Sequence, residues 1–173
     1  MGVVGQSDRF TCNERTVLGR PAMSGDRMRF WLPTMMILTL SIQGCVSIQV
    51  QPVDRALQLK HVCIRENPRV KIDDFVGVVQ DGFDRHGIST ELVRDGSDLP
   101  ERCEYVLTYA AVRAWDLAEY MHYAHLRLEH KGATVAYAEY RLINKGGLDL
   151  RKFRDVKAKM DPVIDELLGP SDR

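Results

Sequence analysis

Apolar and polar residues follow a strand-like pattern over much of the second half of the chain. Residues 61–64, 88–93, 103–115, 120–128 and 135–143 are rich in aromatic, β-branched and other apolar side chains, and turn residues bound them. This pattern predicts five strands. The last two are separated by a Lys-Gly pair and are expected to form an antiparallel hairpin.

Two further segments have the three-and-four spacing of amphipathic helices. Residues 75–83 form the first, with Asp73 or Asp74 as its N-cap. The second opens near residue 149 and contains Pro162, which predicts a kink or a restart there. Each helix must bury its apolar stripe against a sheet face. The order β-α-β-β-β-β-α therefore predicts an α+β fold, a two-layer sandwich of two helices on a mostly antiparallel sheet of about five strands.

The apolar segment at residues 30–42 differs from the rest of the chain. It is shorter than the roughly 20 residues of a membrane-spanning helix, and Arg27 and Arg29 flank it, as in a secretory signal. The IQGC sequence that follows resembles the lipobox of bacterial lipoproteins. That resemblance implies cleavage between Gly44 and Cys45 and a lipid on Cys45. The alternative is a buried apolar helix in which the cysteine packs as a small hydrophobe.

These patterns divide the chain into four parts. Residues 1–27 are expected to be a disordered leader or the result of a mis-chosen start, and residues 28–44 a lipoprotein signal peptide. Residues 45–60 are expected to be a tether, and residues 61–169 a single α/β domain.

Composition narrows the functional classes. The 173 residues include 24 Lys and Arg against 24 Asp and Glu, so the formal net charge is zero. A nucleic-acid binder built on a basic face is therefore not expected. Hydrophobic content of 45% with 28% charged residues is ordinary for a globular domain.

Cys63 and Cys103 are the two cysteines inside the expected domain. In an oxidising compartment they are expected to form a disulfide that closes a loop of about 40 residues. The alternative is two separate buried cysteines, because the sequence does not show whether their Cβ atoms meet.

Candidate catalytic and metal-binding residues are few. His122, His125 and His130 lie close in sequence, but residues three apart on a strand point to opposite faces, so no metal site is expected. His61 and Cys63 share a strand face, yet a disulfide would consume the thiol. No recognised nucleophile or phosphate-loop motif is present, and we expect neither a cofactor nor an enzyme.

Two surfaces are candidates for interaction. Tyr105, Tyr109, Arg113 and Trp115 fall on one face of the longest expected strand, with core packing as the alternative. A local basic excess is a candidate for contact with lipid head groups, with a solvated helix face as the alternative. Its members are Arg151, Lys152, Arg154, Lys157 and Lys159.

Several motifs together resemble a family of short, uncharacterised bacterial lipoproteins. They are KHVCIREN, DGFDRHGI, CEYVLTYAAVRAWD, AYAEYRL and KMDPVIDELL, in this order, and the resemblance extends from Cys45 to about Leu168. It implies an envelope lipoprotein in the outer membrane, because Val46 stands where inner-membrane retention usually has Asp. It brings no established activity.

We therefore expect a non-catalytic module, anchored through Cys45 with its domain in the periplasm, that binds an envelope protein or glycan. One alternative is a hydrolase-like enzyme with a site assembled from scattered residues such as Asp116, His122 and Glu139. The other is a periplasmic carrier of a small ligand.

Overall fold

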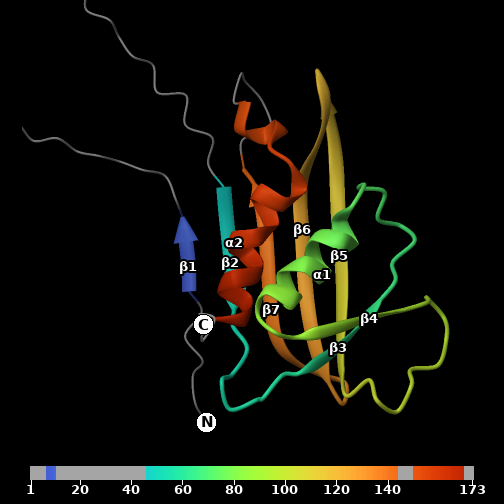
Figure 1. Ribbon diagram of the computed structural model, residues 1–173. Coiled ribbons are helices and arrows are strands. Elements are labelled where there is room, and N and C mark those ends of the chain that lie inside the picture. Colours follow the sequence, from blue (N-terminus) through green and yellow to red (C-terminus); the bar gives the residue numbers. More distant parts are fainter. Residues whose placement is uncertain (1–6, 11–45, 144–149, 170–173) are drawn as a thin grey trace, which may run out of the picture.

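The computed structural model describes residues 7–10, 46–143 and 150–169. Within these ranges the chain forms one sheet, and both α-helices lie over the same face of it (Figure 1). No helix formed by the described residues lies over the other face.

The sheet has the strand order β1-β2-β7-β6-β5-β3-β4. Pairing is antiparallel from β1 to β5, and parallel between β5 and β3 and between β3 and β4. The strands are β1 (Ser7–Phe10), β2 (Val46–Gln51), β3 (His61–Arg65), β4 (Ser89–Val93), β5 (Tyr105–Asp116), β6 (Ala118–His130) and β7 (Ala133–Leu142).

Helix α1 (Phe75–Arg85) connects β3 to β4, and α2 (Val156–Leu168) follows the short 3₁₀ helix η1 (Leu150–Phe153). Asp74 is the N-cap residue of α1, although its side chain makes no capping hydrogen bond. At α2 the carboxylate of Asp155 accepts a 2.7 Å hydrogen bond from the backbone N–H of Ala158.

Of the kink or restart expected at Pro162, the restart is wrong. Pro162 lies inside α2, which continues to Leu168. None of the helices in the described ranges has the length and apolar composition needed to cross a bilayer.

The main core lies between the helices and the sheet. Gly82 brings α1 against α2, because a Cβ atom at this position would stand 2.8 Å from two side-chain atoms of Ile164. A smaller cluster lies on the opposite face, formed by Cys63, Val93, Cys103 and Val106. The fully buried side chains of the main core include Val62, Ile64, Phe83, Leu107, Leu126, Leu128, Met160, Val163, Ile164 and Leu167.

The predicted two-layer α+β sandwich with a mostly antiparallel sheet is confirmed, and the five expected strands are β3 to β7. The structure adds β1 and β2. The expected tether is wrong over its first residues, because Val46–Gln51 pairs with β7 as β2. Ser7–Phe10, expected to belong to a disordered leader, pairs with β2 as β1.

Candidate functional site

The uncovered face of β7 presents a row of polar side chains. Ala136, Ala138 and Tyr140 belong to the core beneath the helices. Side chains alternate along a strand, so Tyr137, Glu139 and Arg141 point to the face without helices.

The neighbouring strand β6 contributes to the same row. Tyr123 is the register partner of Arg141, and His125 is the partner of Glu139. We call these side chains the Glu139 cluster, and its members are Tyr123, His125, Tyr137, Glu139 and Arg141.

Glu139 is the hydrogen-bonded centre of this cluster. Its Oε2 atom accepts hydrogen bonds from the hydroxyls of Tyr137 at 2.6 Å and Tyr123 at 3.3 Å. Its Oε1 atom accepts from Nε and Nη2 of Arg141 at 3.1 and 2.7 Å. The Glu139 side chain is only 15% exposed, whereas that of Arg141 is exposed. The carboxylate is therefore satisfied from within the sheet.

Aromatic rings surround this carboxylate. The guanidinium carbon of Arg141 lies 5.2 Å from the centroid of the Tyr123 ring, within the range of a cation–π contact. The His125 ring lies 6.1 Å from that of Tyr137, in a stacked arrangement, and 5.9 Å from that of Tyr123, edge to face. The cluster thus combines π-faces, a cation and a carboxylate on one flat surface.

The environment shifts the pKa values of these groups away from neutrality. Burial raises the pKa of Tyr137, and its hydrogen bond to Glu139 raises it further. Burial would also raise the pKa of Glu139, but the hydrogen bonds from Tyr137 and Arg141 outweigh this, and the pKa is lowered. Burial lowers the pKa of His125, and the positive charge of Arg127 adds to that shift.

These shifts bear on what the cluster does chemically. A general acid or base works best when its pKa is near the operating pH. Glu139 is held ionised and Tyr137 is held protonated, so neither is ready to exchange a proton at neutral pH. The geometry instead favours recognition through hydrogen bonds, ring stacking and the exposed guanidinium of Arg141.

The predicted aromatic surface on β5 is divided by the structure. Tyr109 is 5% exposed, packs 5.5 Å from the ring of Phe75 and accepts a hydrogen bond from the Asn67 backbone, so core packing, and not the interaction surface, describes this residue. The half-buried Tyr105 stacks on His130.

Beyond the bulge at Val112/Arg113, the other two members of that predicted surface are exposed. Arg113 forms a 2.7 Å ion pair with Glu119. Trp115, at the end of the β5–β6 hairpin, is 74% exposed.

The predicted basic patch is also divided. Lys152 and Lys159 are 2% and 4% exposed, so they are not available to head groups. Lys152 pairs with Asp116, and Nζ of Lys159 donates to the backbone carbonyls of Met121 and Lys152 at 3.0 and 2.6 Å. A long lysine side chain can be buried when its ammonium group donates hydrogen bonds to acceptors inside the protein, because these bonds offset the cost of desolvation.

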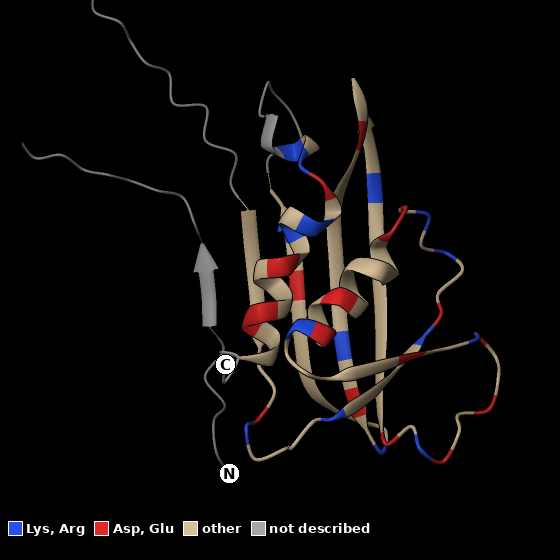
Figure 2. Ribbon diagram, in the orientation of Figure 1, with Lys and Arg blue, Asp and Glu red and all other residues tan. Residues whose placement is uncertain are grey.

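Two of the remaining basic residues have described side chains, and these differ in their surroundings. Arg154 is exposed, and Lys157 lies 3.8 and 3.5 Å from the carboxylates of Asp81 and Asp161. The side chain of Arg151 lies outside the described residues. Figure 2 shows acidic and basic residues interspersed along the helices and loops.

Cys63 and Cys103 form the predicted disulfide, with their Cα atoms 5.4 Å apart. It joins β3 to the loop before β5, on the face without helices. Gly44 and Cys45, the predicted cleavage and lipidation residues, lie outside the described ranges.

Two of the residues named for the enzyme alternative, Asp116 and Glu139, lie far apart. Asp116 pairs in register with Ala118, and Glu139 pairs with His125, seven residues further along β6. At the rise of a strand this separates Asp116 from Glu139 by about 23 Å. His130, the last residue of β6, pairs with Glu104 at 3.0 Å.

Comparison with known proteins finds similar solved structures at low identity. No family model and no curated protein matches the chain. The PelC dodecamer from Paraburkholderia phytofirmans is similar at 12% identity with a TM-score of 0.49, over 71% of this chain and 98% of that chain. A variant of that dodecamer is similar at 13% identity with a TM-score of 0.46, over 68% and 96% of the two chains.

A minor lipoprotein from Acinetobacter baumannii is also among the similar structures. It has 17% identity and a TM-score of 0.25, over 67% of this chain and 87% of that chain. These likenesses transfer no residue roles to this protein.

Proposed function

We propose that this protein is a lipoprotein of the bacterial outer membrane, anchored through a lipid on Cys45, that binds another envelope component without catalysing a reaction. The bound component is an envelope protein or a glycan. The Glu139 cluster is the surface through which it binds.

The observation that carries the proposal is the Cys63–Cys103 disulfide. Disulfides persist outside the reducing cytosol. The lipobox-like IQGC sequence and the apolar segment before it independently imply export. Two unrelated features therefore favour the same side of the inner membrane.

The binding role is supported by the character of the uncovered sheet face. Tyrosine and arginine are enriched among the residues that contribute most to binding energy. In this protein the uncharged β2 residues Ser47, Gln49 and Gln51 extend the row, since they pair in register with Arg141, Glu139 and Tyr137. A ligand that offers a face for stacking together with hydroxyl or amide groups, such as a sugar ring or a peptide strand, matches this combination of rings and hydrogen-bonding groups.

The anchor is tested by palmitate labelling and membrane fractionation of the full chain in a bacterial host. Cys45→Ser is expected to abolish both the label and the membrane association, whereas Cys12→Ser, in the other cysteine upstream of the domain, leaves both unchanged. Retention of label and membrane association in Cys45→Ser would refute the anchor.

The binding surface is tested by photo-crosslinking in intact envelopes. A benzophenone amino acid at Tyr137 is expected to give discrete adducts that disappear when Arg141→Ala is introduced. The same probe at Lys157, an exposed residue of α2, is the control and is expected to give none. Equal adducts from both positions would refute a specific surface.

A further inference from the structure

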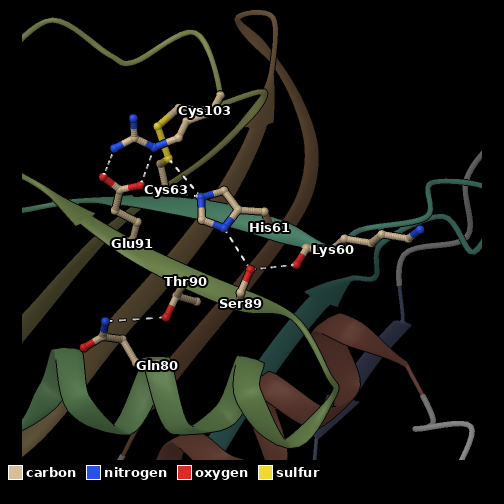
Figure 3. A network of polar contacts seen from close by, with 9 residues as sticks. Lys60, His61, Cys63, Gln80, Ser89, Thr90, Glu91 and Cys103 are labelled. Carbon is tan, nitrogen blue, oxygen red and sulfur yellow. Dashed lines mark hydrogen bonds and ion pairs between the residues drawn. A yellow bond between two sulfur atoms is a disulfide. The ribbon is translucent and has the colours of Figure 1, made fainter.

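A second group of polar side chains lies beside the disulfide, at the edge of the sheet formed by β3 and β4. His61 lies two residues before Cys63 on β3, and Glu91 is the register partner of Cys63 on β4. One ligand atom from each of these three residues lies within 4.8 Å of the others. Figure 3 shows their side chains converging beside Cys103.

A hydrogen bond to Ser89 fixes the orientation of the His61 ring. Its Nδ1 atom lies 2.8 Å from Oγ of Ser89, and that hydroxyl donates a 3.0 Å hydrogen bond to the carbonyl of Lys60. Because the Ser89 hydroxyl donates its proton to the Lys60 carbonyl, Oγ of Ser89 acts as the acceptor for His61. Nδ1 of His61 is therefore the donor in that contact. Nε2 then carries the lone pair, and it faces Cys63 and Glu91 (Figure 3). Metal-ligating histidines are commonly held in this way by a second hydrogen bond.

Two of the three distances are close to those between ligands of one tetrahedral ion, and the third pair, Sγ of Cys63 and the Glu91 carboxylate, lies within 4.8 Å. Nε2 of His61 lies 3.8 Å from Sγ of Cys63 and 3.8 Å from Oε2 of Glu91. Zinc bonds of about 2.0–2.3 Å place tetrahedral ligands about 3.3–3.8 Å apart. The His61 and Glu91 side chains are each about one-third exposed, so an ion has access from solvent.

We propose that reduction of the Cys63–Cys103 disulfide converts this group into a zinc site. Its four ligands are His61, Cys63, Glu91 and Cys103. A dithiol reductant is oxidised to its own disulfide as the protein disulfide becomes two thiols. Binding of Zn²⁺ then releases the two thiol protons and forms two zinc–thiolate bonds.

Glu91 has a different partner in the oxidised protein. Arg102 holds it through two hydrogen bonds, at 2.8 and 2.5 Å. Two thiolates would add negative charge beside Cys103, and the divalent cation would compensate it. The metal thus replaces the cross-link between β3 and the loop before β5 that reduction removes.

The experiment uses the full chain with Cys12→Ser and Cys45→Ser, so that Cys63 and Cys103 are its only thiols. The reduced protein is titrated with Co²⁺, followed by displacement with Zn²⁺. We expect a thiolate-to-cobalt charge-transfer band and the intense visible bands of a tetrahedral ion, with one equivalent bound. The oxidised protein is expected to show neither. Absence of the charge-transfer band in the reduced protein would overturn the proposal.

Three variants test the geometry. His61→Ala is expected to weaken cobalt binding at least tenfold, and Ser89→Ala about tenfold through the lost orientation of the ring. The matched control is His130→Ala, which also removes a strand-end histidine paired with a carboxylate and is expected to leave the affinity unchanged. Equal affinities in all three variants would show adventitious thiolate chelation and overturn the proposal.

If reduction unfolds the chain, circular dichroism is used to measure whether Zn²⁺ restores the fold. Recovery of the folded spectrum on addition of Zn²⁺ to the reduced chain supports the site. A chain that stays unfolded with Zn²⁺ present contradicts it.

Discussion

Removing the Cys63–Cys103 disulfide is expected to destabilise the domain, because the unfolded chain without the cross-link has more conformational entropy. The bridge joins residues 40 apart in sequence, and a closed loop of this length corresponds to about 4 kcal/mol on the chain-entropy model. Both cysteines are buried, so the double variant Cys63→Ala/Cys103→Ala also loses some packing.

The assay is equilibrium unfolding in urea, followed by circular dichroism, with a chelator present and with Cys12 and Cys45 replaced by serine. For a slope of about 2 kcal/mol per molar urea, the midpoint is expected to fall by about 2 M in the double variant. Reduction of the parent protein should give a similar fall, and the double variant should be insensitive to the reductant. A shift below about 0.5 M would refute the reasoning.

Three further outcomes follow from burial and charge. Gly82→Ala is expected to cost about 1–3 kcal/mol in thermal unfolding, since the new methyl group meets Ile164 at 2.8 Å; no loss would mean that α1 and α2 separate freely. Glu139 has a lowered pKa in the folded state, so its stabilisation is present above about pH 4.5 and is lost as the pH falls; acid titration should therefore be steeper for the parent protein than for Glu139→Gln. Burial lowers the pKa of Lys159 from 10.5 to about 8. The unfolded chain therefore holds the Lys159 proton more tightly between these pH values, and the parent protein should gain stability on the order of 3 kcal/mol relative to Lys159→Met as the pH rises through them; parallel pH profiles would contradict this.

The elements with strong local signals were predictable from the sequence. The five strands β3 to β7 and the helix α1 end within a few residues of their expected bounds, because turn residues and apolar periodicity act locally. The strand β2 was not predicted. Its sequence VSIQVQ alternates apolar and polar residues, but its position directly after the expected anchor suggested a tether.

The Glu139 cluster was missed because bulges interrupt the alternation of side chains. Register shifts occur at Val112/Arg113 and at Leu128/Glu129. Each shift moves the following residues to the opposite face of the sheet. A prediction that assumes strict alternation along the long hairpins therefore assigns some residues to the wrong face. Within β7 alone, alternation does place Tyr137, Glu139 and Arg141 together, and it was the signal available in the sequence.

The burial of Tyr109 and the two lysines had a different cause. Tyr109 was expected either in the core or on a surface, and only tertiary packing against Phe75 decides between them. In the sequence, Lys152 and Lys159 belong to a run of basic residues that is typical of a solvated helix face. Their burial depends on Asp116 and on the backbone carbonyl of Met121, which lie more than thirty residues away in sequence.

The position of β2 limits where a partner is able to stand. A flexible tether of 16 residues would let the domain range about 22 Å from its anchor, but here the first residue after Cys45 already belongs to the sheet. Arg141 lies beside Ser47 and Glu139 beside Gln49, the second and fourth residues of β2, so Glu139 pairs within about 10 Å of the start of that strand. If Cys45 is lipidated as proposed, the Glu139 cluster would stay close to the membrane surface and move only laterally with it. A partner would then have to present its contact site near the lipid head groups.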